Sequence, residues 1–322
     1  MEQFGLEDGI IKIFYKPQES IEKAEEAEPS ESVEKLCLQA AENYENGNTE
    51  QALKLWGAAA ERDCAHAQFC LGVCLFEGIG AEIRYSAAAQ LFEKAAGQGH
   101  SGAQYYLAVC YESGLGVDAD LERAFDLLQS SAEQDDVCAQ VRLGMYYRKY
   151  RDLDFADNKA FYWFSQAANR EYVPAVYRLG ECYFDGIGQP ADKSKALRFF
   201  EAAAAKDYFP AFYRLGTCFE KGDGVEKDIK KAAENYLKAA RGGYAPAQYS
   251  LAQFYENGTV VEQSYEEAVR LYREAAEAGD PAAQNAYGWC FVVGKIVKQN
   301  VCEAVRWFQR AAKQGNMRAQ YN

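Results

Sequence analysis

The sequence repeats itself every 36 residues from Ala65 onward. Seven full repeats follow one another without an insertion and end at Asn316. Their first residues, with that of an incomplete eighth repeat, are Ala65, Ser101, Val137, Val173, Phe209, Ala245, Pro281 and Met317. A fixed period of about 20–50 residues is the signature of stacked repeats, each packing only against its neighbours. The length of 322 residues, which alone would suggest two globular domains, is therefore a poor guide to the fold.

The first half of each repeat has the spacing of an amphipathic helix. Counted from the first residue of a repeat, position 3 is always alanine, and position 8 is glycine or alanine. Positions 7 and 11 carry leucine or an aromatic residue. These four positions fall on one stripe of an α-helix. The small residue at position 8 lets a neighbouring helix come close.

A turn and a second helix complete the repeat. Position 14 is glycine in six of the seven repeats, and glycine supplies the positive φ that ends a helix. Asp120, Asp192 and Asp228 at position 20 are good helix N-caps, and Ser264 with Glu267 forms a capping box. The following helix carries alanine at position 24 and leucine, phenylalanine or tyrosine at position 28. We therefore predict an all-α fold of stacked helical hairpins.

This pattern closely resembles the Sel-one-like repeat (SLR) family, a 36-residue relative of the tetratricopeptide repeat. The segments 67–72 (AQFCLG) and 114–120 (GLGVDAD) are typical of that family. The resemblance covers about four fifths of the chain and implies a right-handed α-solenoid, an α/α superhelix. It also implies a noncatalytic scaffold, since SLR proteins serve in signalling, quality control and contacts between bacteria and hosts. The turn of the third repeat, at residues 150–152, departs from the family pattern.

The chain outside the seven repeats divides into three parts. Residues 1–32 carry nine acidic and three basic side chains and are expected to form a flexible acidic tail. Within them, Ile10–Tyr15 is either a tail segment that packs on the fold or a motif that adds to the sheet edge of a partner. Residues 33–64 are predicted to form a tetratricopeptide-like capping repeat, followed by the SLR solenoid at 65–322. The six residues after Asn316 are too few for a helix pair, so the chain is either a fragment of a longer array or has an open apolar end, which we expect to fray or self-associate.

Most chemistry is disfavoured by composition. Only two histidines occur, His66 and His100, and no Walker-type phosphate loop is present. A net charge of −13 argues against nucleic-acid binding. The sequence contains no run of about 18 apolar residues, so no membrane span is predicted, and no signal peptide is seen. We therefore predict a noncatalytic, cytoplasmic protein without a cofactor, and delivery as a bacterial effector is left open.

The ten cysteines are predicted to be reduced thiols. Five of them lie at position 10, where other repeats carry tyrosine or phenylalanine, so this position is interpreted as a packing site. The disulfide-bearing branch of the SLR family pairs cysteines eight residues apart, a spacing that this chain lacks. A metal site at His66, Cys70 and Cys74 is the alternative. It is disfavoured because i, i+4, i+8 spacing drifts around a helix.

A candidate binding surface follows from the resemblance, which places positions 2, 5, 6, 9, 12 and 13 of the first helices along a concave groove. Three consecutive repeats carry arginine at position 6, where family members often have asparagine. Arginine forks suit carboxylates and phosphates, and tyrosines supply rigid contact area. The predicted partner-binding residues are Arg142, Met145, Arg148, Lys149, Tyr177, Arg178, Tyr213, Arg214 and Tyr249. The alternative is internal pairing of these arginines with acids such as Glu181.

The sequence thus favours an interaction scaffold that binds a peptide or protein segment in its groove, and the arginines favour an acidic segment. A regulatory subunit that acts through its N-terminal tail is the second hypothesis. A hydrolase-like enzyme with paired acids is the third. The partner and the oligomeric state are left open.

Overall fold

The fold was determined as a computed structural model that describes residues 32–150 and 155–322. Within these residues it contains seventeen α-helices and no β-strand. Every helix from α3 to α15 with an odd number begins at position 1 of a repeat, as predicted from the period. The helices are α1 Val33–Glu45, α2 Thr49–Glu61, α3 Ala65–Glu77, α4 Tyr85–Gly97, α5 Ser101–Ser113, α6 Leu121–Glu133, α7 Val137–Lys149, α8 Ala156–Ala168, α9 Val173–Asp185, α10 Lys193–Ala204, α11 Phe209–Lys221, α12 Ile229–Arg241, α13 Ala245–Asn257, α14 Tyr265–Glu277, α15 Pro281–Val293, α16 Val301–Lys313 and α17 Met317–Tyr321.

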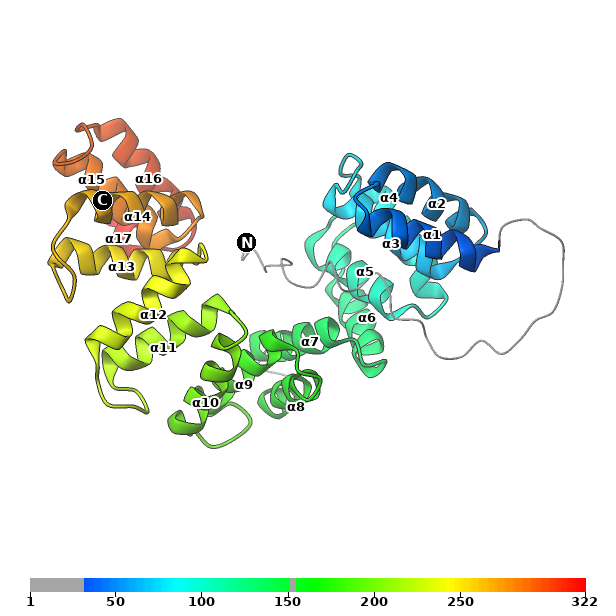
Figure 1. The fold of residues 1–322 in the computed structure, drawn as a ribbon, viewed down its shortest axis with the longest axis horizontal. Helices are drawn as coiled ribbons and strands as arrows, with labels where there is room; N and C mark the ends of the chain where they lie inside the picture. Colours follow the sequence, from blue (N-terminus) through cyan, green and yellow to red (C-terminus); the bar gives the residue numbers. More distant parts are fainter. Residues whose placement is uncertain (1–31, 151–154) are drawn as a thin grey trace. The chain divides into compact units, whose positions relative to one another are not determined.

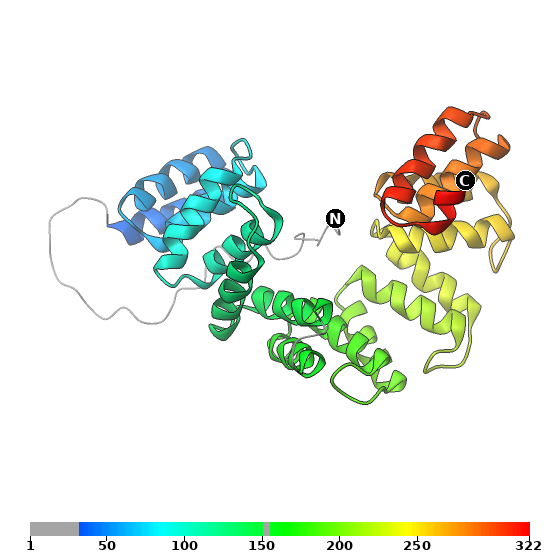
Figure 2. The ribbon, with the colours of Figure 1, turned by 180° about the vertical axis from the view of Figure 1, so that it is seen from behind.

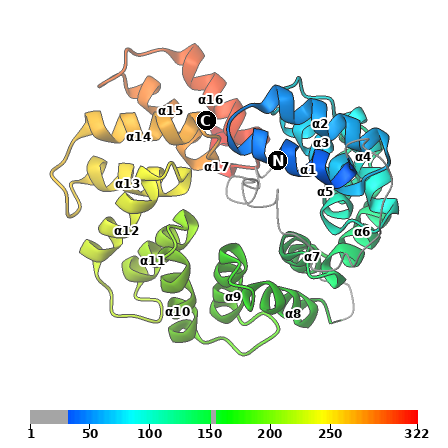
Figure 3. The ribbon, with the colours of Figure 1, turned by 45° about the vertical axis from the view of Figure 1, so that its right-hand side comes forward.

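The helices pair as hairpins, and the hairpins group into two compact units. An N-terminal unit spans Met1–Tyr146 and a C-terminal unit spans Tyr147–Asn322. In the C-terminal unit the hairpins α11–α12, α13–α14 and α15–α16 follow one another in both the front and the back views (Figures 1 and 2). The short helix α17 lies against α16 (Figure 3). The prediction of an all-α repeat solenoid is confirmed.

The helix boundaries arise from the local signals in the sequence. The carboxylate of Asp120 accepts hydrogen bonds from the backbone N–H groups of Glu122 and Arg123, at 3.1 and 3.0 Å. Ser264 Oγ likewise accepts from the N–H of Glu267 at 3.2 Å. Such caps satisfy amides that have no partner within the helix. Gly186, with φ of 74°, ends α9 in the left-handed conformation that glycine adopts without strain.

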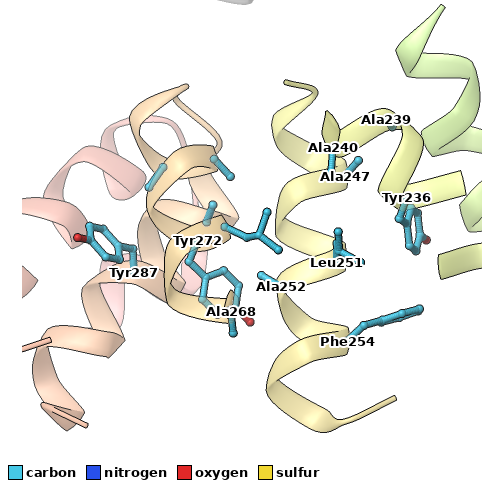
Figure 4. Packing of buried hydrophobic residues seen from close by; sticks show 14 of the residues in the cluster. Tyr236, Ala239, Ala240, Ala247, Leu251, Ala252, Phe254, Ala268, Tyr272 and Tyr287 are labelled. Carbon is cyan, nitrogen blue, oxygen red and sulfur yellow. The ribbon is translucent and has the colours of Figure 1, made fainter. Parts of the chain in front are cut away.

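The core is a continuous stack of small and aromatic side chains. Alanine at position 3 is fully buried in all seven full repeats. In the cluster around α13, Leu251 and Ala252 lie between Tyr236 of the preceding hairpin and Tyr272 of their own (Figure 4). A Cβ atom added to Gly180 would lie 2.5 Å from Cε1 of Phe200, so position 8 must stay small where this ring packs on the helix backbone. Each hairpin therefore buries its stripe partly against its own partner helix and partly against the next hairpin.

All ten cysteines are free thiols in the structure, and four of the five at position 10 are completely buried. These four are Cys74, Cys110, Cys182 and Cys218. They pack as small apolar side chains, which agrees with the packing interpretation of position 10. Burial raises the pKa of Cys182 to about 12, so this thiol stays protonated at neutral pH.

The remaining expectations concern the two ends of the chain and the turn of the third repeat. The tail and its segment Ile10–Tyr15 lie outside the described residues, as does most of the unusual turn in the third repeat. Residues 33–64 form the hairpin α1–α2, which packs on α3. At the other end, α17 buries Ala319 and leaves Met317 and Tyr321 exposed. Fraying or self-association of that end stays a prediction.

Candidate functional site

The predicted arginines lie in two separate groups, one in each compact unit. In the N-terminal unit, Arg142 of α7 donates through Nε to Oε2 of Glu112 on α5 at 2.8 Å. The side chains of these two residues are 18% and 28% exposed. An ion pair this sheltered is screened less by salt than a pair at an open surface. Arg142 is therefore held in a fixed position by an acid of the preceding repeat.

In the C-terminal unit, two arginines share one carboxylate. Arg178 Nη1 lies 2.7 Å from Oε2 of Glu181, one helical turn along α9. Arg148 Nη1 reaches the same oxygen from α7 at 3.4 Å. The hydroxyl of Tyr177 donates to the other oxygen, Oε1, at 3.3 Å. Glu181 thus gathers three side chains from two successive repeats.

Arg214 extends this group by one repeat. Its Nη2 atom lies 3.8 Å from Oδ1 of Asp185, and its guanidinium stacks over the ring of Phe184 at 4.3 Å. Arg148 Nη2 approaches Oδ2 of Asp185 at 3.9 Å. The buried Nε atom of Arg214 has no hydrogen-bond partner among the described residues. We call Arg148, Arg178 and Arg214 the arginine cluster.

The arginine cluster carries an excess of positive charge. Its three guanidinium groups face two carboxylates, those of Glu181 and Asp185, which leaves one positive charge uncompensated within the cluster. The arginine side chains are 24–27% exposed. Internal pairing, the alternative weighed from the sequence, is therefore present in the structure. About a quarter of each arginine side chain still faces solvent.

The other predicted residues differ in how much surface they offer. Tyr177 is buried against Phe200 and Tyr208, so it supports Arg178 more than it offers a contact. Met145, Tyr213 and Tyr249 are half-buried, and Lys149 is exposed beside the ring of Tyr150. Burial is the main cause of the raised pKa of Tyr249, and the nearby phenol of Tyr213 contributes. The two tyrosines lie at position 5 of successive first helices, and both pack against the core cluster around α13.

A cleft of about 570 Å³ lies at the C-terminal end of the same unit. Residues of α13, α14, α15 and α17 and the turn after α15 line it. Tyr249, Trp289, Val293 and Tyr321 occupy positions 5, 9, 13 and 5 of their repeats, which are positions that the resemblance assigns to the groove. Trp289 is 46% and Val293 65% exposed, so an apolar wall faces solvent. We call this feature the C-terminal cleft.

Two cations and one carboxylate border the C-terminal cleft. The ammonium of Lys295 sits 3.2 Å from the ring centroid of Tyr265. Neither Lys295 nor Arg318 forms an ion pair with a residue in the part of the chain that the structure describes. Glu256 accepts a hydrogen bond from the hydroxyl of Tyr272 at 2.6 Å. The cleft therefore combines exposed apolar surface with cations that remain available to an anion.

Of the residues that line the C-terminal cleft, Tyr249 alone was among the partner-binding residues predicted from the sequence. The available signal was an apolar Trp289 at position 9 and Val293 at position 13, both outside the core stripe. Lys295 and Ile296 belong to the turn, whose path was not predictable from the period. No group of three or more histidine, cysteine or acidic side chains is placed to hold a metal ion within residues 32–150 and 155–322. Nor is any helix there long and apolar enough to cross a membrane.

Comparisons with known proteins agree with this architecture. A family model described as Sel1 repeat matches residues 36–64, 65–100, 101–136, 139–172, 173–208, 210–244, 245–280 and 281–316. The first of these matches falls on the hairpin that we predicted as a tetratricopeptide-like cap. No curated protein matches the chain.

Several solved structures are similar to this fold. A Sel1 repeat protein from Oxalobacter formigenes is 27% identical, with a TM-score of 0.61, over 90% of this chain and 85% of that one. The antigen c5321 of uropathogenic Escherichia coli, described as a protective antigen with an SLR fold, is also 27% identical. Its TM-score is 0.57, over 89% of this chain and 70% of that one. Yeast Tom70, at 14% identity and a TM-score of 0.52 over 96% of this chain and 66% of that one, shares the fold alone.

Proposed function

Because the chain belongs to the Sel1 repeat family, whose members are generally interaction scaffolds, we propose that it is a noncatalytic adaptor for an acidic protein segment. The segment lies along the first helices of the C-terminal unit. Its acidic side chains meet the arginine cluster, and a large apolar side chain enters the C-terminal cleft.

One observation carries this proposal: the arginine cluster and the C-terminal cleft both lie on first helices, at positions that the resemblance assigns to the groove. Arg178 and Arg214 stand at position 6, and Tyr213 and Tyr249 at position 5 of adjoining repeats. Tyr249 lines the cleft, so the tyrosines connect it to the arginines. A cationic stretch followed by an apolar cleft fits a segment that has acidic residues beside an apolar anchor.

The energetics set the expected size of each contact. A hydrogen bond to a charged group contributes about 1.5–3 kcal/mol when it is desolvated, and less at an exposed rim. The arginines are only about a quarter exposed, and they start from existing ion pairs, so a ligand gains only the difference. We therefore expect about a tenfold loss of affinity when one arginine is removed.

The test starts from a random peptide library displayed on phage and selected on the full chain. Acidic peptides with a large apolar residue should be enriched. The selected peptide, labelled with a fluorophore, then reports its dissociation constant by anisotropy. Arg178→Ala, Arg214→Ala and Trp289→Ala should each weaken binding about tenfold, and binding should fall with added salt.

Matched controls come from the same unit. Arg270 forms ion pairs with Glu267 and Glu274 on α14, outside the groove positions, and Tyr162 on α8 is 52% exposed. Arg270→Ala and Tyr162→Ala should leave the affinity unchanged. If the groove variants bind as tightly as the unaltered chain and only unfold at lower temperature, the arginines are internal braces and the proposal is wrong.

The hypothesis that the tail binds the partner is tested in the same assay. Deletion of residues 1–31 should leave the affinity of the selected peptide unchanged. A cytoplasmic location is part of the proposal, and it is supported by the ten free thiols.

A further inference from the structure

Two cysteines far apart in the sequence bring their sulfur atoms into contact in the N-terminal unit. Cys37 on α1 and Cys64, the N-cap residue of α3, lie with their Sγ atoms 3.7 Å apart. Cys37 is buried, and Cys64 is partly exposed. The Cys64 side chain is therefore accessible to a reagent, and the Cys37 side chain is buried next to it. Closing the remaining gap to the length of an S–S bond, about 2 Å, needs only a small movement.

The surroundings of the two sulfurs make them chemically unequal. A hydrogen bond from Cys37 and the backbone N–H groups of Ala67 and His66 lower the pKa of Cys64 to about 6, against the opposing effect of burial. The Cys64 sulfur makes no capping hydrogen bond to α3. The first turn of α3 therefore stabilises the thiolate through the partial positive charge at the helix N-terminus. The hydrogen bond with Cys64, then burial, raise the pKa of Cys37. Cys64 is thus the nucleophile, and Cys37 stays a thiol.

We propose that Cys37 and Cys64 form a redox-active thiol pair, which a small disulfide such as oxidised glutathione converts into an intramolecular disulfide. The Cys64 thiolate attacks one sulfur of oxidised glutathione and expels one glutathione thiolate. The Cys37 thiol then loses its proton, and its sulfur attacks Sγ of Cys64 and expels the second glutathione. Two protein thiols are oxidised and one glutathione disulfide is reduced to two thiols.

The bridge would join the first hairpin to the next repeat. Cys37 lies on α1 and Cys64 starts α3, so the disulfide closes a loop that contains α2. Such a closure lowers the entropy of the open chain and holds α1 on the repeat array. The oxidised protein should therefore exchange the backbone amides of α1 with deuterium at least tenfold more slowly than the reduced protein.

The test uses the full chain in buffers with defined ratios of reduced to oxidised glutathione, followed by mass spectrometry of a nonreduced digest. The expected product is a Cys37–Cys64 disulfide with the other eight thiols free. In the Cys37→Ser variant, glutathione should instead accumulate on Cys64. In the Cys64→Ser variant, oxidised glutathione should react with Cys37 at least tenfold more slowly than it reacts with Cys64 in the unaltered chain.

Cys302 on α16 supplies the internal control, because it is exposed and, among the described residues, no second cysteine contacts its sulfur as Cys37 contacts Cys64. Cys302→Ser should leave formation of the bridge unchanged. The proposal is wrong if oxidised glutathione modifies Cys302 while Cys37 and Cys64 both remain thiols. It is also wrong if the unaltered chain keeps glutathione on Cys64 and no disulfide between Cys37 and Cys64 forms. The unaltered chain alone can give either result, so the test does not depend on a variant that folds.

Discussion

Arg178 donates a hydrogen bond to Glu181 over 2.7 Å, within a single turn of α9. Both side chains occupy positions that the resemblance assigns to the groove, so in the proposed complex a ligand carboxylate at Arg178 would compete with Glu181. Arg148 contacts the same carboxylate from the preceding repeat. In the proposed function this pairing would couple the stability of the fold to the affinity for an acidic segment, and the two effects are separable by experiment.

Glu181→Gln should raise the affinity for the selected acidic peptide about threefold to tenfold. The substitution removes the negative charge that occupies Arg148 and Arg178 and keeps the size of the side chain. Because two partly buried arginines lose their partner, the free energy of unfolding should fall by about 1–2 kcal/mol. Anisotropy titration and urea denaturation measure the two effects. Glu267→Gln, which removes a partner of Arg270, should leave the affinity unchanged.

Gly180→Ala should destabilise the C-terminal unit by about 1–3 kcal/mol, because the added methyl group meets the ring of Phe200 at 2.5 Å. Adding Phe200→Leu should recover part of the loss, since the second repeat already combines Ala108 with Leu128 at the equivalent positions. Gly57 on α2 is the control: an added Cβ would meet no atom within 4 Å. Gly57→Ala should stabilise the protein by about 0.4–1 kcal/mol. Urea denaturation of the three variants would contradict this account if Gly180→Ala and Gly57→Ala behaved alike.

The fold was predictable because its determinants are local and recur. Alanine at position 3 and the small residue at position 8 set the helix register, and caps such as Asp120 set the boundaries. The contacts of the candidate site are not of this kind. The pairing of Arg148 with Glu181 depends on where successive repeats place α7 and α9, and the C-terminal cleft requires α13, α15 and α17 to meet. Likewise, the contact of Cys37 with Cys64 joins the first hairpin, which lies outside the 36-residue period, to the next repeat.

The N-terminal unit should lose stability as the pH falls from 6.5 towards 4. Burial, followed by the nearby His66, lowers the pKa of His100 to about 4 from its ordinary value of 6.5. The unfolded chain therefore binds a proton in this window before the folded chain does, so stability is fully present above pH 6.5 and lost as the pH falls through the window. The neutral ring also caps α5, where Nδ1 accepts from the N–H of Ala103 at 3.2 Å. The loss at pH 4 should be on the order of 2–3 kcal/mol.

His100→Asn provides the matched comparison for this pH dependence. Asn316 occupies the same repeat position and caps α17 through Oδ1, 3.1 Å from the N–H of Ala319. The variant thus keeps a capping acceptor and removes the titrating group. Urea unfolding at several pH values should show a shallower decline for the variant below pH 6.5. Parallel curves for the two proteins would show that His100 does not titrate in this way.

The most direct measurement of the central claim, that an acidic segment binds along the first helices into the C-terminal cleft, is site-specific photo-crosslinking of the selected peptide. A benzophenone amino acid replaces Val293 in the cleft or, as the control, Val301 on α16 outside it. These two valines are 65% and 64% exposed, so they differ in place and not in accessibility. The account predicts a covalent adduct from position 293 that excess unlabelled peptide abolishes, and none from position 301. Equal yields at both positions, or an adduct at 301 alone, would contradict it.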